Sequence, residues 1–98
     1  MQRCLSCRGV GGKRVRVCLD VVGGVVRAAS IVGDFFLSPE YLVDDLVEAL
    51  RGRRVSEALK VLHEALRGLG GAVESAGITW DELVNCIAAV LKGFLDVS

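Results

Sequence analysis

The sequence predicts an α+β fold: a small antiparallel three-stranded sheet with about three helices packed on one of its faces. Two periodicities carry this prediction. Apolar residues recur at every second position before residue 33, as in strands with one buried face, and at every third or fourth position after residue 39, as in helices. Between them, Gly33 permits a sharp change of backbone direction, and Ser38-Pro39 is typical of a helix start. We expect residues 1–98 to form a single domain.

The sheet is expected over residues 13–37, after an irregular, glycine-containing lead-in at residues 1–12. The clearest strand spans residues 13–22, whose valines and leucine at odd-numbered positions share one face. Gly23-Gly24 predicts a two-residue hairpin turn. Residues 25–32 return antiparallel, with a poorer alternation that leaves the register open and suggests a bulge.

A third strand is expected over residues 34–37. There Phe35 and Leu37 share one face and Phe36 points to the other, because side chains alternate along a strand. One phenylalanine is therefore expected in the core. The other is expected at a sheet edge or against a partner.

Helices are expected over residues 39–97. The first spans about 39–51 and ends at Gly52, and the second spans about 56–67. The third begins with a capping box, in which Thr79 caps the helix and Glu82 reaches back to it, and runs to about residue 95. This third helix is apolar on so many sides that it is either central to the fold or part of an interface.

The charges are segregated, although the net charge is zero. Residues 1–32 contain six basic residues and one acidic residue, whereas residues 33–50 contain five acidic residues and no basic one. Either the hairpin and the first helix neutralise each other locally, or the hairpin presents a basic face to a phosphate-bearing ligand or an acidic partner. Zero net charge and few aromatic residues argue against nucleic-acid binding. We expect no membrane association and a cytoplasmic protein, because no apolar stretch approaches the roughly 20 residues of a membrane span and no signal peptide is evident.

The four cysteines raise the question of a metal site. A structural zinc site usually needs two closely spaced ligand pairs, and here Cys4 and Cys7 form one C-x-x-C whereas Cys18 and Cys86 are isolated. We expect Cys18 and Cys86 to be buried, inert thiols. Cys4 and Cys7 could form a disulfide, bind a metal jointly with a partner, or have no role, so they are weak metal candidates.

No catalytic constellation is evident in the sequence. His63 is the only histidine, and its position at the edge of the apolar stripe of the second helix is typical of a satisfied or surface histidine. Gly12-Lys13 does not fit a phosphate-binding P-loop, since Arg14 stands where that motif needs Ser or Thr and a strand follows it. Lys13 beside a flexible backbone could still approach a phosphate or a partner's carboxylate, or it could simply be solvated at a turn.

One stretch resembles a known family. Gly33-Asp34-Phe35-Phe36-Leu37, followed by Pro39-Glu40 and a helix that ends at Leu50-Arg51-Gly52, is similar to the accessory C-terminal domain of lipoate–protein ligases. In some archaea this domain is a separate small subunit. The similarity extends back to Gly11-Gly12-Lys13 and covers residues 8–67 well, but the last helix only in outline. It implies an antiparallel sheet backed by helices, similar to the fold of iron–sulfur scaffold proteins.

The resemblance also implies a function. The chain would be the non-catalytic, accessory subunit of an archaeal ATP-dependent lipoate–protein ligase, a heterodimer with a catalytic subunit. It would bind no cofactor alone, and with its partner it would be required to activate lipoate to lipoyl-adenylate from ATP and Mg²⁺. The lipoyl group then passes to an acceptor, either a dehydrogenase lipoyl domain or the glycine-cleavage carrier. The implied residues of contact with the partner or ligand are Gly12, Lys13, Gly33, Asp34, Phe35 and Phe36.

Two alternatives belong to other functional classes. A metal or iron–sulfur carrier would need at least three cysteines, such as Cys4, Cys7 and Cys18, to converge in space. A plain interaction module would bind an unrelated partner.

Overall fold

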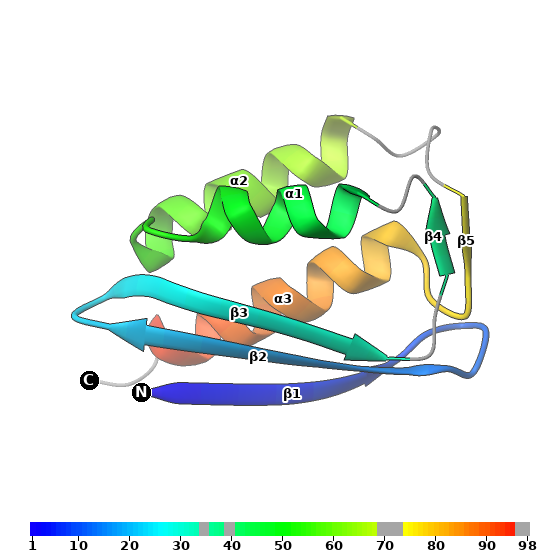
Figure 1. Ribbon diagram of the computed structural model, residues 1–98, viewed down its shortest axis with the longest axis horizontal. Coiled ribbons are helices and arrows are strands. Elements are labelled where there is room, and N and C mark those ends of the chain that lie inside the picture. The colour runs from blue at the N-terminus through cyan, green and yellow to red at the C-terminus, as the bar shows by residue number, and fades with distance from the viewer. Residues whose placement is uncertain (34–35, 39–40, 69–73, 96–98) are drawn as a thin grey trace.

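The computed structural model describes residues 1–33, 36–38, 41–68 and 74–95, and it has the predicted α+β architecture. A three-stranded antiparallel sheet has the order β1 (Gln2–Arg8), β2 (Arg14–Val22), β3 (Val25–Gly33). The helices are α1 (Tyr41–Leu50), α2 (Val55–Gly68) and α3 (Trp80–Leu95), and they lie on one side of the sheet (Figure 1). The similarity to the iron–sulfur scaffold fold stays a prediction.

The predicted lead-in at residues 1–12 was wrong in part, because β1 occupies most of it. β1 pairs with β2 along its whole length, from Gln2 opposite Asp20 to Arg8 opposite Arg14. It shows no alternation in sequence because nearly all of its side chains remain exposed, so it buries too little apolar surface to produce the usual pattern. Pairing with β2, and not its own composition, defines it as a strand.

The β2–β3 hairpin is as predicted. Gly23 and Gly24 have φ angles of +61° and +79°, which the two-residue turn requires. The register shifts between Asp20 and Val21, and this irregularity is the bulge that the poorer alternation of β3 suggested. The odd-numbered residues of β2 are buried: Val15, Val17 and Leu19 are at most 1% exposed.

The third predicted strand does not join this sheet. Its described part, β4 (Phe36–Ser38), pairs antiparallel with β5 (Glu74–Ala76) in a separate two-stranded sheet. The three-stranded sheet of the prediction thus consists of β1, β2 and β3, and the range 39–97 contains β5 as well as helices. The pairing of β4 and β5 joins residues almost forty positions apart, so local pattern could not reveal it.

Helix α3 is central to the fold, one of the two alternatives that its apolar composition left open. It contacts α2 as well as β1 and β2. The Trp80 indole Nε1–H donates a hydrogen bond of 3.1 Å to the carbonyl oxygen of Ala65, which joins the start of α3 to the end of α2. No helix in the described part of the chain is long and apolar enough to cross a membrane. The buried residues of α3 are Trp80, Leu83, Val84, Cys86, Ile87, Val90 and Leu91.

Candidate functional site

Three of the predicted contact residues, Gly12, Lys13 and Gly33, are described in full, and they lie at one end of the molecule. Gly12 and Lys13 lie in the turn between β1 and β2. Gly33 ends β3, where it pairs with Val15, two residues after Lys13. Figure 1 shows the β1–β2 turn, the end of β3 and the β4–β5 pair at this same end. The sheet register therefore brings Gly33 to the same end as Gly12 and Lys13, which lie about twenty positions earlier in the sequence.

The remaining predicted residues are described only in part. Asp34 and Phe35 lie outside the described residues. The backbone of Phe36 pairs with Ala76 in β4, but its side chain is also outside the description. Leu37 is 4% exposed, which fits the expectation that this segment contributes one face to the core. The expected contact of one of the two phenylalanines with a partner stays a prediction.

Glycines let the β1–β2 turn fold back on the segment that precedes α3. The Gly9 N–H donates to the carbonyl of Lys13 and the Gly12 N–H donates to the carbonyl of Gly9, each at 2.9 Å. A Cβ at Gly9 would collide with the carbonyl oxygen of Gly77, and one at Gly11 would lie 2.9 Å from the Gly77 Cα. Gly12, by contrast, faces open space with a φ of +84°. The turn is thus fixed at its base and exposed at its tip.

Glu82 fastens this turn to α3. The predicted capping box is confirmed: the Glu82 N–H donates to the Thr79 hydroxyl at 3.1 Å, and the Thr79 N–H donates to Glu82 Oε1 at 2.9 Å. Glu82 Oε2 also accepts a hydrogen bond of 2.8 Å from the Val10 N–H. These bonds, led by the one from the Thr79 backbone, lower the pKa of Glu82 because they favour its charged form.

The contact between Glu82 and Val10 could not be seen in the sequence. The capping box predicted one use of the carboxylate, but the second partner lies 72 residues away. Since a carboxylate accepts several hydrogen bonds, one side chain caps α3 and positions the glycine turn. With both oxygens engaged and its pKa lowered, Glu82 is a structural acceptor and a poor general base.

The expectation of inert thiols at Cys18 and Cys86 was wrong, and of the alternatives left open for Cys4 and Cys7, the disulfide between these two does not form. Cys4 is bonded to Cys18 and Cys7 to Cys86, and none of the four is free. Cys4 and Cys7 lie three residues apart in a strand, so their side chains point to opposite faces and cannot act as a C-x-x-C pair. Cys18 is therefore the disulfide partner of Cys4, and Cys86 is that of Cys7, so neither is an inert thiol.

These disulfides leave the carrier alternative without thiolate ligands. The sulfurs form two separate pairs, whereas a carrier would need at least three of them to converge. Within the residues that the structure describes, no group of three or more histidine, cysteine, aspartate or glutamate side chains could hold a metal ion. His63 is exposed, as expected, and lines a groove of about 480 Å³ between α2 and α3.

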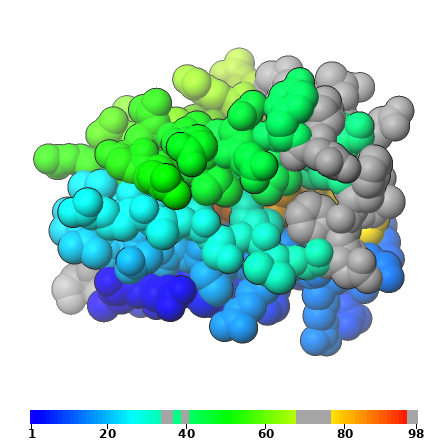
Figure 2. All heavy atoms as spheres, in the orientation of Figure 1, coloured from blue at the N-terminus to red at the C-terminus, as the bar shows by residue number. Residues whose placement is uncertain are grey.

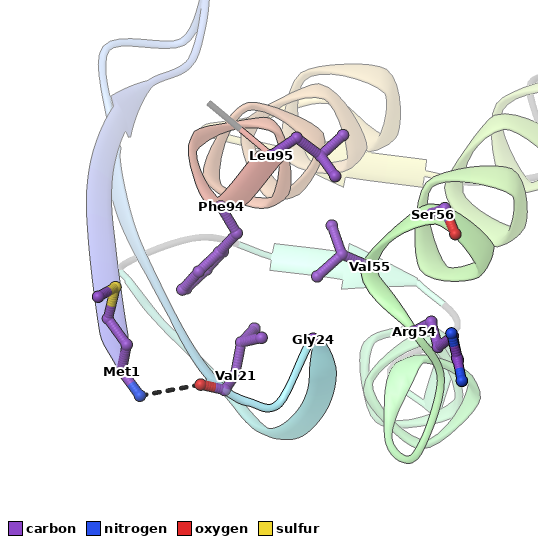
Figure 3. Close-up of a pocket in the computed structure, with 8 residues that line it drawn as sticks. All are labelled: Met1, Val21, Gly24, Arg54, Val55, Ser56, Phe94 and Leu95. Carbon is purple, nitrogen blue, oxygen red and sulfur yellow. Dashed lines mark hydrogen bonds between the residues drawn. The ribbon is translucent and has the colours of Figure 1, made fainter. Parts of the chain in front are cut away.

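A separate hollow lies at the opposite end of the molecule, near the β2–β3 turn, with a volume of about 380 Å³. Figure 3 shows Val21, Val55 and Phe94 directed into it, whereas the Arg54 side chain extends away from Phe94. The N-terminal amine closes one side by donating to the Val21 carbonyl at 2.8 Å. None of the described residues that line this hollow is a predicted contact residue.

Comparisons with known proteins support the expected resemblance at the level of fold. No protein-family profile matches the chain, and a search of curated proteins finds no match. Among solved structures, the chain is similar to one chain of an archaeal lipoylation system, a bipartite lipoate protein ligase and its E2 lipoyl domain from Thermoplasma acidophilum. The two chains are 23% identical and align with a TM-score of 0.63 over 89% of this chain and 97% of the other. They therefore share a fold and are of similar length.

Proposed function

We propose that this chain is the accessory, non-catalytic subunit of an ATP-dependent lipoate–protein ligase. The observation that carries the proposal is the near-complete alignment with a chain of a bipartite lipoate protein ligase system. The similarity of Gly33-Asp34-Phe35-Phe36-Leu37 and Gly11-Gly12-Lys13 to the ligase accessory domain supports it independently. The partner would be a catalytic subunit that binds ATP, Mg²⁺ and lipoate. The acceptor would be a dehydrogenase lipoyl domain or the glycine-cleavage carrier.

In this proposal the chain closes over the active site of its partner. A lid of this kind excludes water from a reactive acyl-adenylate and completes the binding site for charged groups. The end of the molecule that carries Gly12, Lys13 and Gly33 is suited to this task, because Glu82 and the Gly9–Gly77 contact hold the turn in place. A pre-positioned turn loses little conformational freedom when it docks.

Lys13 would supply the positive charge. It is exposed and follows Gly12, whose lack of a side chain leaves the backbone open to a close approach. An ammonium group there can pair with a phosphate or with a carboxylate of the partner. By the resemblance, Asp34, Phe35 and Phe36 would be further residues of contact with the partner.

The test is lipoyl-adenylate formation by the candidate catalytic subunit from ATP, Mg²⁺ and lipoate, with and without this chain. Activity is expected only when both proteins are present. Lys13→Ala and Phe36→Ala should each weaken complex formation or adenylation. Lys60→Ala, which removes an exposed charge on α2, is the matched control and should leave both unchanged.

Two results would contradict the proposal. One is a catalytic subunit that forms lipoyl-adenylate equally well alone. The other is a complex whose assembly and activity are insensitive to both Lys13→Ala and Phe36→Ala. In either case the chain would share the fold of the ligase component without its function, and an interaction module for another partner would become the leading interpretation.

A further inference from the structure

Three arginines occupy adjacent positions on the face of the sheet that points away from the helices. Arg8 on β1 lies directly opposite Arg14 on β2, and Arg16 follows two residues later on β2. Residues in direct register, and residues two apart on one strand, share a face. All three side chains are exposed. We call this surface, defined by Arg8, Arg14 and Arg16, the arginine face.

No carboxylate in the described part of the chain neutralises the arginine face. Like charges directly opposite each other across two strands are destabilising. Among the described residues, no ion pair joins any of the three arginines to a carboxylate. Asp20, on the same face, is paired with the N-terminal amine at 3.5 Å, and Glu48 of α1 pairs with Arg51. The local neutralisation of hairpin by first helix that the charge pattern allowed is therefore not observed for these arginines.

An exposed apolar residue borders the arginine face. Val32 lies directly opposite Arg16 on β3 and is 65% exposed. Figure 2 shows that β1, β2 and β3, coloured blue to turquoise, form a continuous lower surface below α1. Arginine next to an exposed apolar residue is typical of a protein–protein interface, whereas a site for phosphate alone would not need the valine.

Disulfides hold this surface rigid. The Cys4–Cys18 bond crosses from β1 to β2 on the same face, and the Cys7–Cys86 bond fixes the other face of β1 to α3. The strand that carries Arg8 is thus held on both sides, although it contributes no residue to the buried core. A rigid surface loses less conformational freedom on association than a mobile one.

We propose that the arginine face is a docking surface for an acidic protein surface. Carboxylates of the partner would pair with Arg8, Arg14 and Arg16, and an apolar side chain would cover Val32. Arginine suits this role because its planar guanidinium can bind a carboxylate through two parallel hydrogen bonds. The arginine face adjoins the contact residues of the proposed function, since Arg14 follows Lys13, but it shares no residue with them. The proposal does not depend on lipoate activation.

The test measures binding of a fluorescent, glutamate-rich synthetic peptide that contains leucines to the isolated chain. Binding is expected at about 0.1 M salt and should be largely lost at about 1 M, where charges are screened beyond roughly 3 Å. The triple variant Arg8→Ala, Arg14→Ala, Arg16→Ala should bind about tenfold more weakly, since exposed ion pairs contribute modestly. Val32→Ser should weaken binding about threefold.

Arg67→Ala, which removes an exposed arginine on α2, is the control and should bind like the native chain. The urea midpoint of the triple variant should not fall, because removing opposed like charges relieves repulsion. Unchanged peptide binding by the triple variant would overturn the proposal. A second result would also overturn it: tripolyphosphate binds the arginines more tightly than the peptide does, and Val32→Ser leaves peptide binding unchanged. That result would identify a phosphate site. No catalytic subunit or lipoate is present, so failure here is separate from failure of the proposed function.

Discussion

The double variant Cys7→Ala, Cys86→Ala should strongly destabilise the fold. The Cys7–Cys86 bond joins residues 79 positions apart, and the Cys4–Cys18 bond joins residues 14 positions apart. The loop-entropy relation then gives about 4.5 kcal/mol for the long loop and about 3 kcal/mol for the short one. Because a domain of this size is stable by only about 5–15 kcal/mol, the Cys7–Cys86 variant should lose between roughly a third and nearly all of its free energy of unfolding.

The assay is urea unfolding followed by the fluorescence of Trp80, the single tryptophan, which is 4% exposed. The double variant Cys4→Ala, Cys18→Ala is the matched comparison, since it removes a disulfide that closes a shorter loop. The melting temperature should fall by roughly 20–35 °C for the Cys7–Cys86 variant, at about 4–8 °C per kcal/mol. Alanine is preferred to serine because an unpaired hydroxyl at the buried position 86 would add its own cost.

Two results would refute this reasoning. If the Cys7–Cys86 variant loses less free energy of unfolding than the Cys4–Cys18 variant, loop length does not govern the effect of these bonds. If thiols titrate in the denatured protein before any reductant is added, the disulfides are not formed in solution. Reduction of the native chain should instead reproduce the combined loss of both bonds.

Three further predictions concern the core and the glycine turn. Ile87→Ala should lower the free energy of unfolding by about 2–5 kcal/mol in the same urea assay, because Ile87 is fully buried in α3 and the change leaves a cavity; a loss below about 1 kcal/mol would contradict its central place. Gly9→Ala should cost more stability than Gly12→Ala, since a Cβ at Gly9 meets backbone whereas Gly12 has open space and only its φ of +84° opposes alanine; the reverse order of urea midpoints would disprove the close contact with Gly77. Glu82 has a folded-state pKa below its ordinary value of 4.5, so its contribution to stability is present above that pH and is lost as the pH falls through the lowered pKa. Melting curves at acid pH should therefore show a shallower pH dependence for Glu82→Gln than for the native chain, and equal slopes would show that the carboxylate is not engaged.

Local pattern alone was enough to predict the helices and the β2–β3 hairpin. The stripes of α1 and α2, the Gly23-Gly24 turn and the capping box at Thr79 depend on residues at most four positions apart. Such features are set by side-chain periodicity and by hydrogen bonds between near neighbours. Gly12, Lys13 and Gly33 were candidate contact residues only through the resemblance to the ligase accessory domain, and the sheet register shows that they share one end.

The tertiary structure decided what depends on distant partners. β1 could not be predicted because its side chains are exposed and follow no alternation, so only its pairing with β2 makes it a strand. The cysteine pairing then follows from that strand, because it turns Cys4 and Cys7 to opposite faces. The hydrogen bond from the Val10 N–H to Glu82 and the pairing of Arg8 with Arg14 across two strands also depend on segments that meet only in the folded chain. A one-dimensional pattern records which side chains face inward, but not which distant segment lies across from them.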